Sequence, residues 1–444
     1  MTMSIQLSDR FTYKMLLYFT LPSIIMMIFT SIYGVVDGFF VSNYVGKTPF
    51  AAVNYIMPFL MILGAVGFMF GTGGSALIAK TMGEGNEDKA KRLFSLFVYV
   101  SAILGIMIAI LGIFFLRPVS AFLGAEGTML EDCVTYGRII LLALPAFILQ
   151  YEFQSFFVTA GKPQMGLMVT VAAGMTNILL DAFLVAVFSL GLPGAAAATA
   201  ISQCVGGIIP LVYFVLPNSS LLQLTKTKLE GKALLKTCTN GSSELMSNIS
   251  MSIVSMLYNI QLMKYAGQDG VAAYGVLMYI NMIFLSAFIG YSVGTAPVIG
   301  YHYGAENHKE LKSLLKKSLI IIGIFSVVML MAAEGLARPL ATIFVGYDSK
   351  LLDITLHGFV IFSFCFLFAG IAIYGSAFFT ALNNGFVSAL ISFLRTLVFQ
   401  VGAVLIFPLI WGINGIWFSI VAAEMMAAIV TAFFLVGMRR KYHY

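Results

Sequence analysis

Residues 159–203 decide the fold, and they read TAGKPQMGLMVTVAAGMTNILLDAFLVAVFSLGLPGAAAATAISQ. This stretch predicts two apolar helices joined by a Gly-Leu-Pro-Gly turn at 191–194, each long enough to cross a bilayer. Asn177 and Asp181 lie inside the first helix, and Thr199 lies inside the second. A carboxylate in a membrane span costs roughly 2.5–3.5 kcal/mol on insertion scales, so we expect Asp181 to have a function and a partner.

The composition of the whole chain indicates an all-α polytopic membrane protein. Of the 444 residues, 60% are hydrophobic and only 10% are charged, with a mean hydropathy of +0.96. Soluble domains carry about 25% charged residues. The pI of 9.0 does not indicate a nucleic-acid partner, because the basic residues fall in loops between spans. The four cysteines include no CxxC pair and predict neither a disulfide framework nor a metal site.

Twelve apolar runs predict twelve transmembrane helices. They lie near residues 14–40, 50–79, 93–116, 134–158, 164–189, 194–217, 234–265, 271–301, 315–337, 355–380, 385–410 and 414–438. With the N-terminus inside, 18 of the 25 Lys and Arg residues fall in inner segments and 6 in outer ones, which places both termini in the cytoplasm. The first run lacks an Ala-x-Ala cleavage site. We therefore expect a multi-pass protein of a bacterial cell membrane.

An internal repeat divides the chain into two halves. An offset of 221 residues pairs Gly83 and Asn86 with Gly304 and Asn307, Arg117-Pro118 with Arg338-Pro339, and Thr159-Ala160 with Thr380-Ala381. Each half holds six spans, an even number, so the two halves enter the membrane with the same orientation. They are expected to be related by a pseudo-twofold axis along the membrane normal, with a substrate path between them.

The repeat also sets the expected domain boundaries. We predict an N-lobe at 1–218, a cytoplasmic connector at 219–231 and a C-lobe at 232–444. The inner loops at 83–94 and 304–315 each predict a glycine turn followed by a short amphipathic helix on the membrane surface.

The intramembrane polar residues are not repeated, which indicates different chemistry in each lobe. At the 221 offset Asp37 faces Tyr258, Asp181 faces Gly402 and Thr199 faces Ile420. Asp37, Asp181 and Thr199 all lie in the outer parts of their spans, and Asn177 shares a helix face with Asp181. The four side chains form an all-oxygen set suited to Na⁺ or H⁺, in which one carboxylate holds a proton when no metal ion is bound. The alternative is that they join helices by hydrogen bonds.

Other polar residues are candidates for a substrate cavity. Glu152 and Gln154 lie in the fourth span, and Glu244 and Arg395 lie in the second half. Structural hydrogen bonds, or pairing of Arg395 with an acid, are the alternatives. Glu424 is a further acid in the last span without an assigned role.

Three motifs together resemble the MATE (multidrug and toxic compound extrusion) transporters. They are Gly161-Lys162-Pro163, then Asn177-Ile178-Leu179-Leu180-Asp181, then Gly191-Leu192-Pro193-Gly194 followed by AAAATAIS. The resemblance covers essentially the whole chain, including Leu21-Pro22 and Asp37.

The resemblance implies a set of site residues. In that family a cation site in the N-lobe binds Na⁺ or H⁺ and drives export of organic cations, and its residues match Asp37, Asn177, Asp181 and Thr199. Pro22 matches a proline associated with bending of the first helix. Some members carry acids well inside the seventh and tenth spans, whereas this chain has Glu244 near the start of the seventh and no acid in the span at 355–380. We therefore expect the site that couples ion movement to export to lie in the N-lobe.

The sequence thus predicts a bacterial-type secondary antiporter that exports amphipathic, mostly cationic drugs in exchange for H⁺ or Na⁺ by alternating access. We expect a monomer in the lipid bilayer, with small organic cations as substrates and no cofactor besides the coupling ion. The main alternative is a flippase for a lipid-linked precursor, which requires a cavity rich in Arg and Lys. A channel and a membrane-embedded transferase are less favoured. The four histidines lie at loops or span ends, so no enzymatic activity is expected.

Overall fold

The computed structural model describes residues 5–346 and 348–444, which lie almost entirely in helices and include no strand. The helices are α1 (Tyr13–Phe40), α2 (Lys47–Gly83), α3 (Glu87–Phe122), α4 (Gly127–Thr159), α5 (Pro163–Leu180), α6 (Gly191–Val215), α7 (Gly231–Gly304), α8 (His308–Val345), α9 (Ser349–Phe362), α10 (Phe366–Ala381), α11 (Gly385–Phe393), α12 (Gln400–Trp411), α13 (Ile413–Gly437) and α14 (Arg439–Tyr442). Short segments of π-helix continue α1, α5 and α11, namely η1 (Val41–Val45), η2 (Asp181–Val187) and η4 (Leu394–Phe399), and a 3-10 turn, η3 (Ser363–Cys365), joins α9 to α10.

The twelve predicted spans are confirmed, although two of them share one long helix. Within the described residues, eleven continuous helices are long and apolar enough to cross a membrane. One of them, α7, has 74 residues, whereas about 20 are enough for one crossing. Gly267 interrupts α7 with φ 65° and ψ −154°, a conformation open to glycine because it has no Cβ. This kink divides α7 into the seventh and eighth spans.

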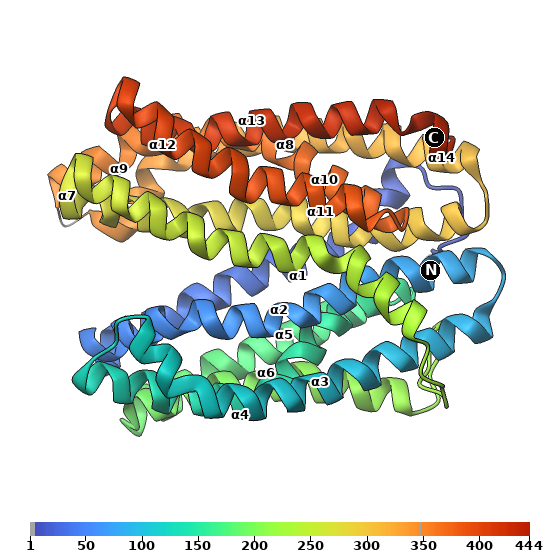
Figure 1. Ribbon diagram of the computed structural model, residues 1–444, viewed down its shortest axis with the longest axis horizontal. Coiled ribbons are helices and arrows are strands. Elements are labelled where there is room, and N and C mark those ends of the chain that lie inside the picture. Colours follow the sequence, from blue (N-terminus) through green and yellow to red (C-terminus); the bar gives the residue numbers. More distant parts are fainter. Residues whose placement is uncertain (1–4, 347) are drawn as a thin grey trace.

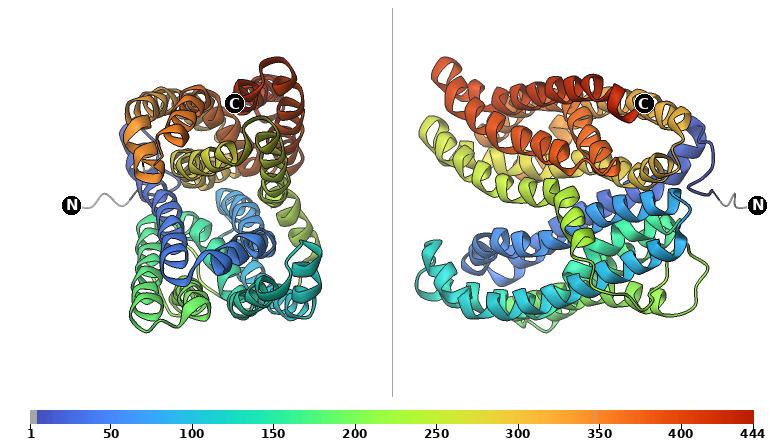
Figure 2. Two further views of the ribbon diagram at one scale, coloured as in Figure 1. Left: turned by 90° about the vertical axis from the view of Figure 1, so that its left-hand side faces the viewer. Right: turned by 45° about the vertical axis from the view of Figure 1, so that its right-hand side comes forward.

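The helices form two lobes that lie side by side. Helices α1–α6 make up one lobe and α7–α13 the other, and the segment between α6 and α7 passes from one to the other without helix (Figure 1). The first described residues and the C-terminus lie at the same end of the molecule (Figure 1), which we call the termini end. The two lobes meet at the termini end and diverge toward the opposite end, the far end (Figure 2).

The predicted surface helices at 83–94 and 304–315 are wrong, because each segment is continuous with the next span. The side-chain oxygen of Asn86 accepts from the backbone N–H of Lys89 at 3.1 Å, and that of Asn307 accepts from Glu310 N–H at 3.2 Å. Each asparagine therefore caps a helix that starts at once. The helices run on without a break as α3 and α8.

Glycines allow the two lobes to touch closely at the termini end. A Cβ on Gly241 of α7 would lie 1.9 Å from the Met69 carbonyl oxygen of α2, and a Cβ on Gly73 would lie 2.1 Å from the Thr237 carbonyl oxygen. In the repeat-related contact, a Cβ on Gly294 of α7 would lie 2.9 Å from the Thr20 methyl carbon of α1. These positions need small residues because helix backbones pack directly on each other there. We call this interface the glycine seam.

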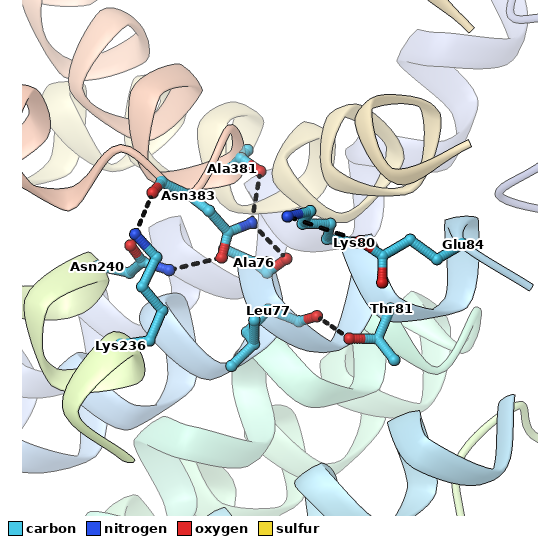
Figure 3. Close-up of polar contacts among 9 residues, drawn as sticks. All are labelled: Ala76, Leu77, Lys80, Thr81, Glu84, Lys236, Asn240, Ala381 and Asn383. Carbon is cyan, nitrogen blue, oxygen red and sulfur yellow. Dashed lines mark hydrogen bonds and ion pairs between the residues drawn. The ribbon is translucent and has the colours of Figure 1, made fainter. Parts of the chain in front are cut away.

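A polar group centred on Asn383 contacts the first lobe beside the glycine seam (Figure 3). Asn383, in the turn between α10 and α11, donates from Nδ2 to the Ala76 carbonyl of α2 at 3.1 Å. Its Oδ1 accepts from Asn240 Nδ2 at 2.7 Å, and its carbonyl accepts from Lys236 Nζ at 2.6 Å. Asn383 and Asn240 are both buried, so these bonds are shielded from water. Asn383 thus bonds to the first lobe through Ala76, while Asn240 and Lys236 fix its turn on α7 of the second lobe; we call this group the polar clamp.

Candidate functional site

The structure brings together the four residues predicted for the cation site. Asp37 lies near the end of α1, Asn177 in α5, Asp181 at the start of η2 and Thr199 in α6. The Thr199 hydroxyl donates to Asp37 Oδ1 at 3.3 Å, and Asn177 Nδ2 reaches the Thr199 hydroxyl oxygen at 3.5 Å. Three helices of the first lobe therefore converge on one polar cluster.

Several oxygens in this cluster are buried without a hydrogen-bond donor. Asp181 is fully buried and Asn177 is 1% exposed. Both carboxylate oxygens of Asp181 and Oδ1 of Asn177 have no partner among the described residues. A buried acceptor without a donor is costly, and a buried carboxylate is costlier still. The arrangement therefore fits a bound proton or a hard cation, which prefers oxygen ligands.

Both helices that carry the carboxylates change from α to π geometry at this site. Helix α5 becomes η2 at Asp181, and α1 becomes η1 directly after Phe40. A π-turn contains more residues than an α-turn, so it shifts the face on which side chains project, and such segments occur often at functional sites. The local backbone thus separates Asp181 from the regular helix that carries Asn177.

Neighbouring tyrosines complete the cluster, and the sequence did not mark them. Tyr136 of α4 is fully buried near Thr199 and Asp37, and its phenol donates to the Met57 sulfur at 3.9 Å. Tyr33 of α1 lies near Asp37 and Gln150. The chain contains 20 tyrosines, and no spacing distinguishes these two from the others.

Glu152 and Gln154 lie inside the first lobe. Glu152 is fully buried in α4, where its carboxylate accepts from the Ser101 hydroxyl of α3 and its backbone lies beside Gly71 of α2. Gln154 lines a cavity of about 10 Å³ between α4, α5 and α6, enough for about one water molecule, and both its amide atoms lack a partner among the described residues. Neither residue lies in an open cavity in this conformation.

Ser101→Ala is expected to lower the free energy of unfolding by about 1–3 kcal/mol, because the buried Glu152 carboxylate loses its donor. Thermal unfolding of the purified protein in detergent measures the change. Ser219→Ala, at an exposed position of the connector, is the control. Adding Glu152→Gln to Ser101→Ala should restore most of the loss, since a neutral amide is less costly to bury. Equal melting temperatures for all variants would contradict this role of Ser101.

The remaining candidates lie outside the cluster. Arg395 of η4 forms an ion pair with Glu424 of α13, with Nε 2.8 Å from Oε2, in the second lobe. Glu244 of α7 is partly exposed and lies near Arg395. Pro22 is buried inside α1, where it supplies no backbone N–H to the helix. The structure thus places these residues away from Asp37 and Asp181.

Comparison with known proteins agrees with this architecture. A family model described as MatE matches residues 22–183 and 245–405, one segment in each lobe. The multidrug export protein MepA of Staphylococcus haemolyticus is 25% identical over 436 residues, covering 97% of this chain and 94% of that protein. A solved multidrug resistance MATE family transporter of the MOP superfamily, in an outward-facing conformation, has a TM-score of 0.92 at 25% identity, covering 99% of this chain and 98% of that chain.

A second solved structure, a MATE protein in complex with MaL6, has a TM-score of 0.92 at 24% identity and covers 99% of this chain and 98% of that chain. The family model spans most of both lobes, and the relatives align over nearly the full length. The chain therefore belongs to the MatE family of MATE transporters.

Proposed function

We propose that this protein is a secondary antiporter that exports amphipathic, mostly cationic compounds in exchange for H⁺ or Na⁺. The observation that carries the proposal is the buried Asp181 carboxylate, whose two oxygens have no donor within the described part of the first lobe. The family membership and the multidrug export activity in the name of the MepA relative support it. Asp37, Asn177, Asp181 and Thr199 bind the coupling ion. Lipid surrounds the protein, which acts as a monomer.

The mechanism follows from the placement of this site. Movement of one charge inward across the membrane releases about 2.3 kcal/mol per 100 mV. Binding of the ion neutralises one negative charge of the Asp37 and Asp181 pair and lowers the cost of keeping that charge buried. That energy difference biases the equilibrium between a form closed at the termini end and a form closed at the far end. Alternating access results, with the substrate path between the lobes.

Transport by the purified protein in proteoliposomes tests this function. Ethidium movement is measured by fluorescence with an imposed Na⁺ gradient, with an imposed pH gradient and with neither. We expect gradient-driven ethidium transport with one of the two ions, which then identifies the coupling ion. Absence of transport under both gradients would contradict the antiporter and favour the flippase, which an assay with labelled lipid would detect.

We also propose that both termini face the cytoplasm, so that the conformation described above is outward-facing. The excess of Lys and Arg in loops at the termini end supports this orientation. Single cysteines at Ser219, in the connector, and at Gly124, between α3 and α4, test it in a background without the native cysteines. In intact cells a membrane-impermeant maleimide should label Gly124→Cys and not Ser219→Cys. The reverse pattern would invert the topology.

A further inference from the structure

The segment that leads into α1 of the first lobe is bound by the second lobe. We call this segment, residues 5–12, the strap; it lies at the termini end beside the turn that joins α7 to α8 (Figure 1). The backbone N–H of Phe11 donates to Glu310 Oε1 of α8 at 3.0 Å. The Phe11 carbonyl accepts from Lys317 Nζ, one helical face further along α8. Two charged side chains of the second lobe thus hold the backbone of one residue next to α1.

Burial adds to this docking. The strap residues Leu7 and Phe11 are 2% and 1% exposed, and both pack in a hydrophobic core built from residues of both lobes. The Asp9 carbonyl oxygen lies 3.2 Å from Nε2 of His302, a buried residue near the end of α7. Glu310 is buried as well, so its bond to the strap is shielded from water. The strap can leave the second lobe only by breaking these bonds and exposing two large apolar side chains.

The repeat places a second segment of this kind at the end of the connector. The 221-residue offset relates the strap to residues 226–233, and it relates α8 to α3. The backbone N–H of Thr225 donates to Ser95 Oγ of α3 at 2.8 Å, and the Thr227 hydroxyl donates to the Arg92 carbonyl of α3 at 2.9 Å. Each lobe therefore binds, on the third of its spans, the segment that leads into the first helix of the other lobe.

The two segments differ in the freedom that they leave to the helix that follows. Only Thr12 lies between the docked Phe11 and the start of α1, and its hydroxyl already caps that helix. In the connector, residues 228–230 lie between the docked Thr227 and the start of α7, outside any helix. Three residues give a lever of about 10 Å on which α7 can swing. Parting of the lobes at the termini end thus leaves the connector docked but pulls directly on the strap.

We propose that the strap is a latch, which holds the termini end closed and leaves α8 when the lobes part there. Glu310 and Lys317 are positioning residues, because they bind the backbone of Phe11 and not the substrate. The connector, which has its own lever, is not a latch. The proposal rests on the alternating access of the proposed function, and it names the contact that must break in the step that opens the termini end.

An insertion that adds free length to the strap tests the proposal. Spin labels on cysteines placed at the exposed positions Lys89 of α3 and Lys312 of α8 report the separation of the lobes at the termini end. Double electron–electron resonance is measured on the full-length protein in detergent, in a background without the native cysteines. Gly-Ser-Gly inserted between Phe11 and Thr12 keeps the docked strap and the helix cap but removes the pull between them. We expect the fraction of molecules at the longer distance to rise by about tenfold or more.

Substitution of the acceptor tests the same contact without a change in chain length. Glu310→Ala leaves the Phe11 N–H without its acceptor and should raise the fraction at the longer distance as the insertion does. Glu310→Gln keeps an acceptor oxygen at the same place and should restore most of the wild-type distribution. A purely structural role of Glu310 would lower the melting temperature in both variants and leave the distances as in the wild type.

The connector supplies matched controls. The same insertion after Lys228, or Thr227→Val, should leave the distance distribution unaltered, since α7 already moves on its own lever. Labels at Ser8, an exposed strap residue, and at Lys312 follow the strap itself. In the wild type this pair should show a longer distance in the same fraction of molecules in which the lobes have parted. In the variant with the strap insertion it should show the short distance alone.

Three results would overturn the latch. They are an unaltered distribution in both the strap insertion and Glu310→Ala, an equal response to the two insertions, and a strap that stays on α8 in wild-type molecules whose lobes have parted. The distances require neither an ion gradient nor a substrate. A failure of gradient-driven ethidium transport would therefore contradict the antiporter, while the response of the lobes to the insertion decides on the latch separately.

Discussion

Asp181→Asn is expected to abolish coupled export, with a fall of at least 100-fold in gradient-driven ethidium transport. The substitution keeps the size of the side chain but removes the buried charge that attracts the coupling ion. Removing one partner of a buried charge pair typically costs about 3–5 kcal/mol, and each 1.4 kcal/mol is about tenfold in affinity. Asp37→Asn should have a similar effect, because Asp37 lies in the same cluster and is bound by Thr199.

A thermal assay separates loss of ion binding from loss of folding. An ion that binds only the folded protein raises its melting temperature. We expect the coupling ion, if Na⁺, to stabilise the wild type and Asp353→Asn, an exposed acid of α9, but not Asp181→Asn. If H⁺ is the coupling ion, the transport rate of the wild type and of Asp353→Asn should depend on pH, and that of Asp181→Asn should not. Normal coupling in Asp181→Asn would show that the ion binds elsewhere.

Gly241→Ala is expected to open the glycine seam. The added Cβ would lie 1.9 Å from the Met69 carbonyl oxygen and 2.7 Å from its carbon, both backbone atoms that no rotamer change can move. Overpacking of this kind costs about 1–3 kcal/mol. That cost falls only on the conformation in which α2 and α7 touch. The equilibrium should therefore shift by roughly 5- to 150-fold toward the form that is open at the termini end.

Distances between spin labels on the two lobes measure this shift. Labels at the termini end should move apart in Gly241→Ala and labels at the far end should approach each other. Gly323→Ala is a matched control, since a Cβ on Gly323 of α8 meets no atom within 4 Å. Asn383→Ala should shift the distances in the same direction by removing the hydrogen bond to the Ala76 carbonyl of the first lobe. Unchanged distances in Gly241→Ala would mean that the glycine seam accommodates the added methyl group without separation of the lobes.

The sequence predicted the features that depend on local composition or on the repeat. Apolar runs marked the spans because each must be about one bilayer long, and the shared depth of Asp37, Asp181 and Thr199 was enough to predict their cluster. Most other contacts between helices were not predictable. Periodicity indicates which residues share a face but not which helix that face meets, so it did not identify Tyr136. The alternative that Arg395 pairs with an acid is confirmed, but the sequence did not show that the acid is Glu424. The surface helices were predicted wrongly because an amphipathic first turn has the same sequence pattern whether the helix ends after it or continues as a membrane span.

The glycine seam has the symmetry of a contact between subunits. The 221-residue offset relates Gly73 to Gly294 and Thr20 to Gly241. Gly73 packs on Gly241, and Gly294 packs on Thr20, so the same contact occurs once on each side of the axis. Gly83 and Gly304 are also related by the offset: a Cβ added to Gly83 would lie 2.0 Å from the Tyr301 carbonyl oxygen, and one added to Gly304 would lie 2.0 Å from the Lys80 carbonyl oxygen. Such an interface is isologous, the kind that two identical subunits make. The two halves of one chain thus make, around an internal axis, the contact that two subunits of a homodimer make around an external one.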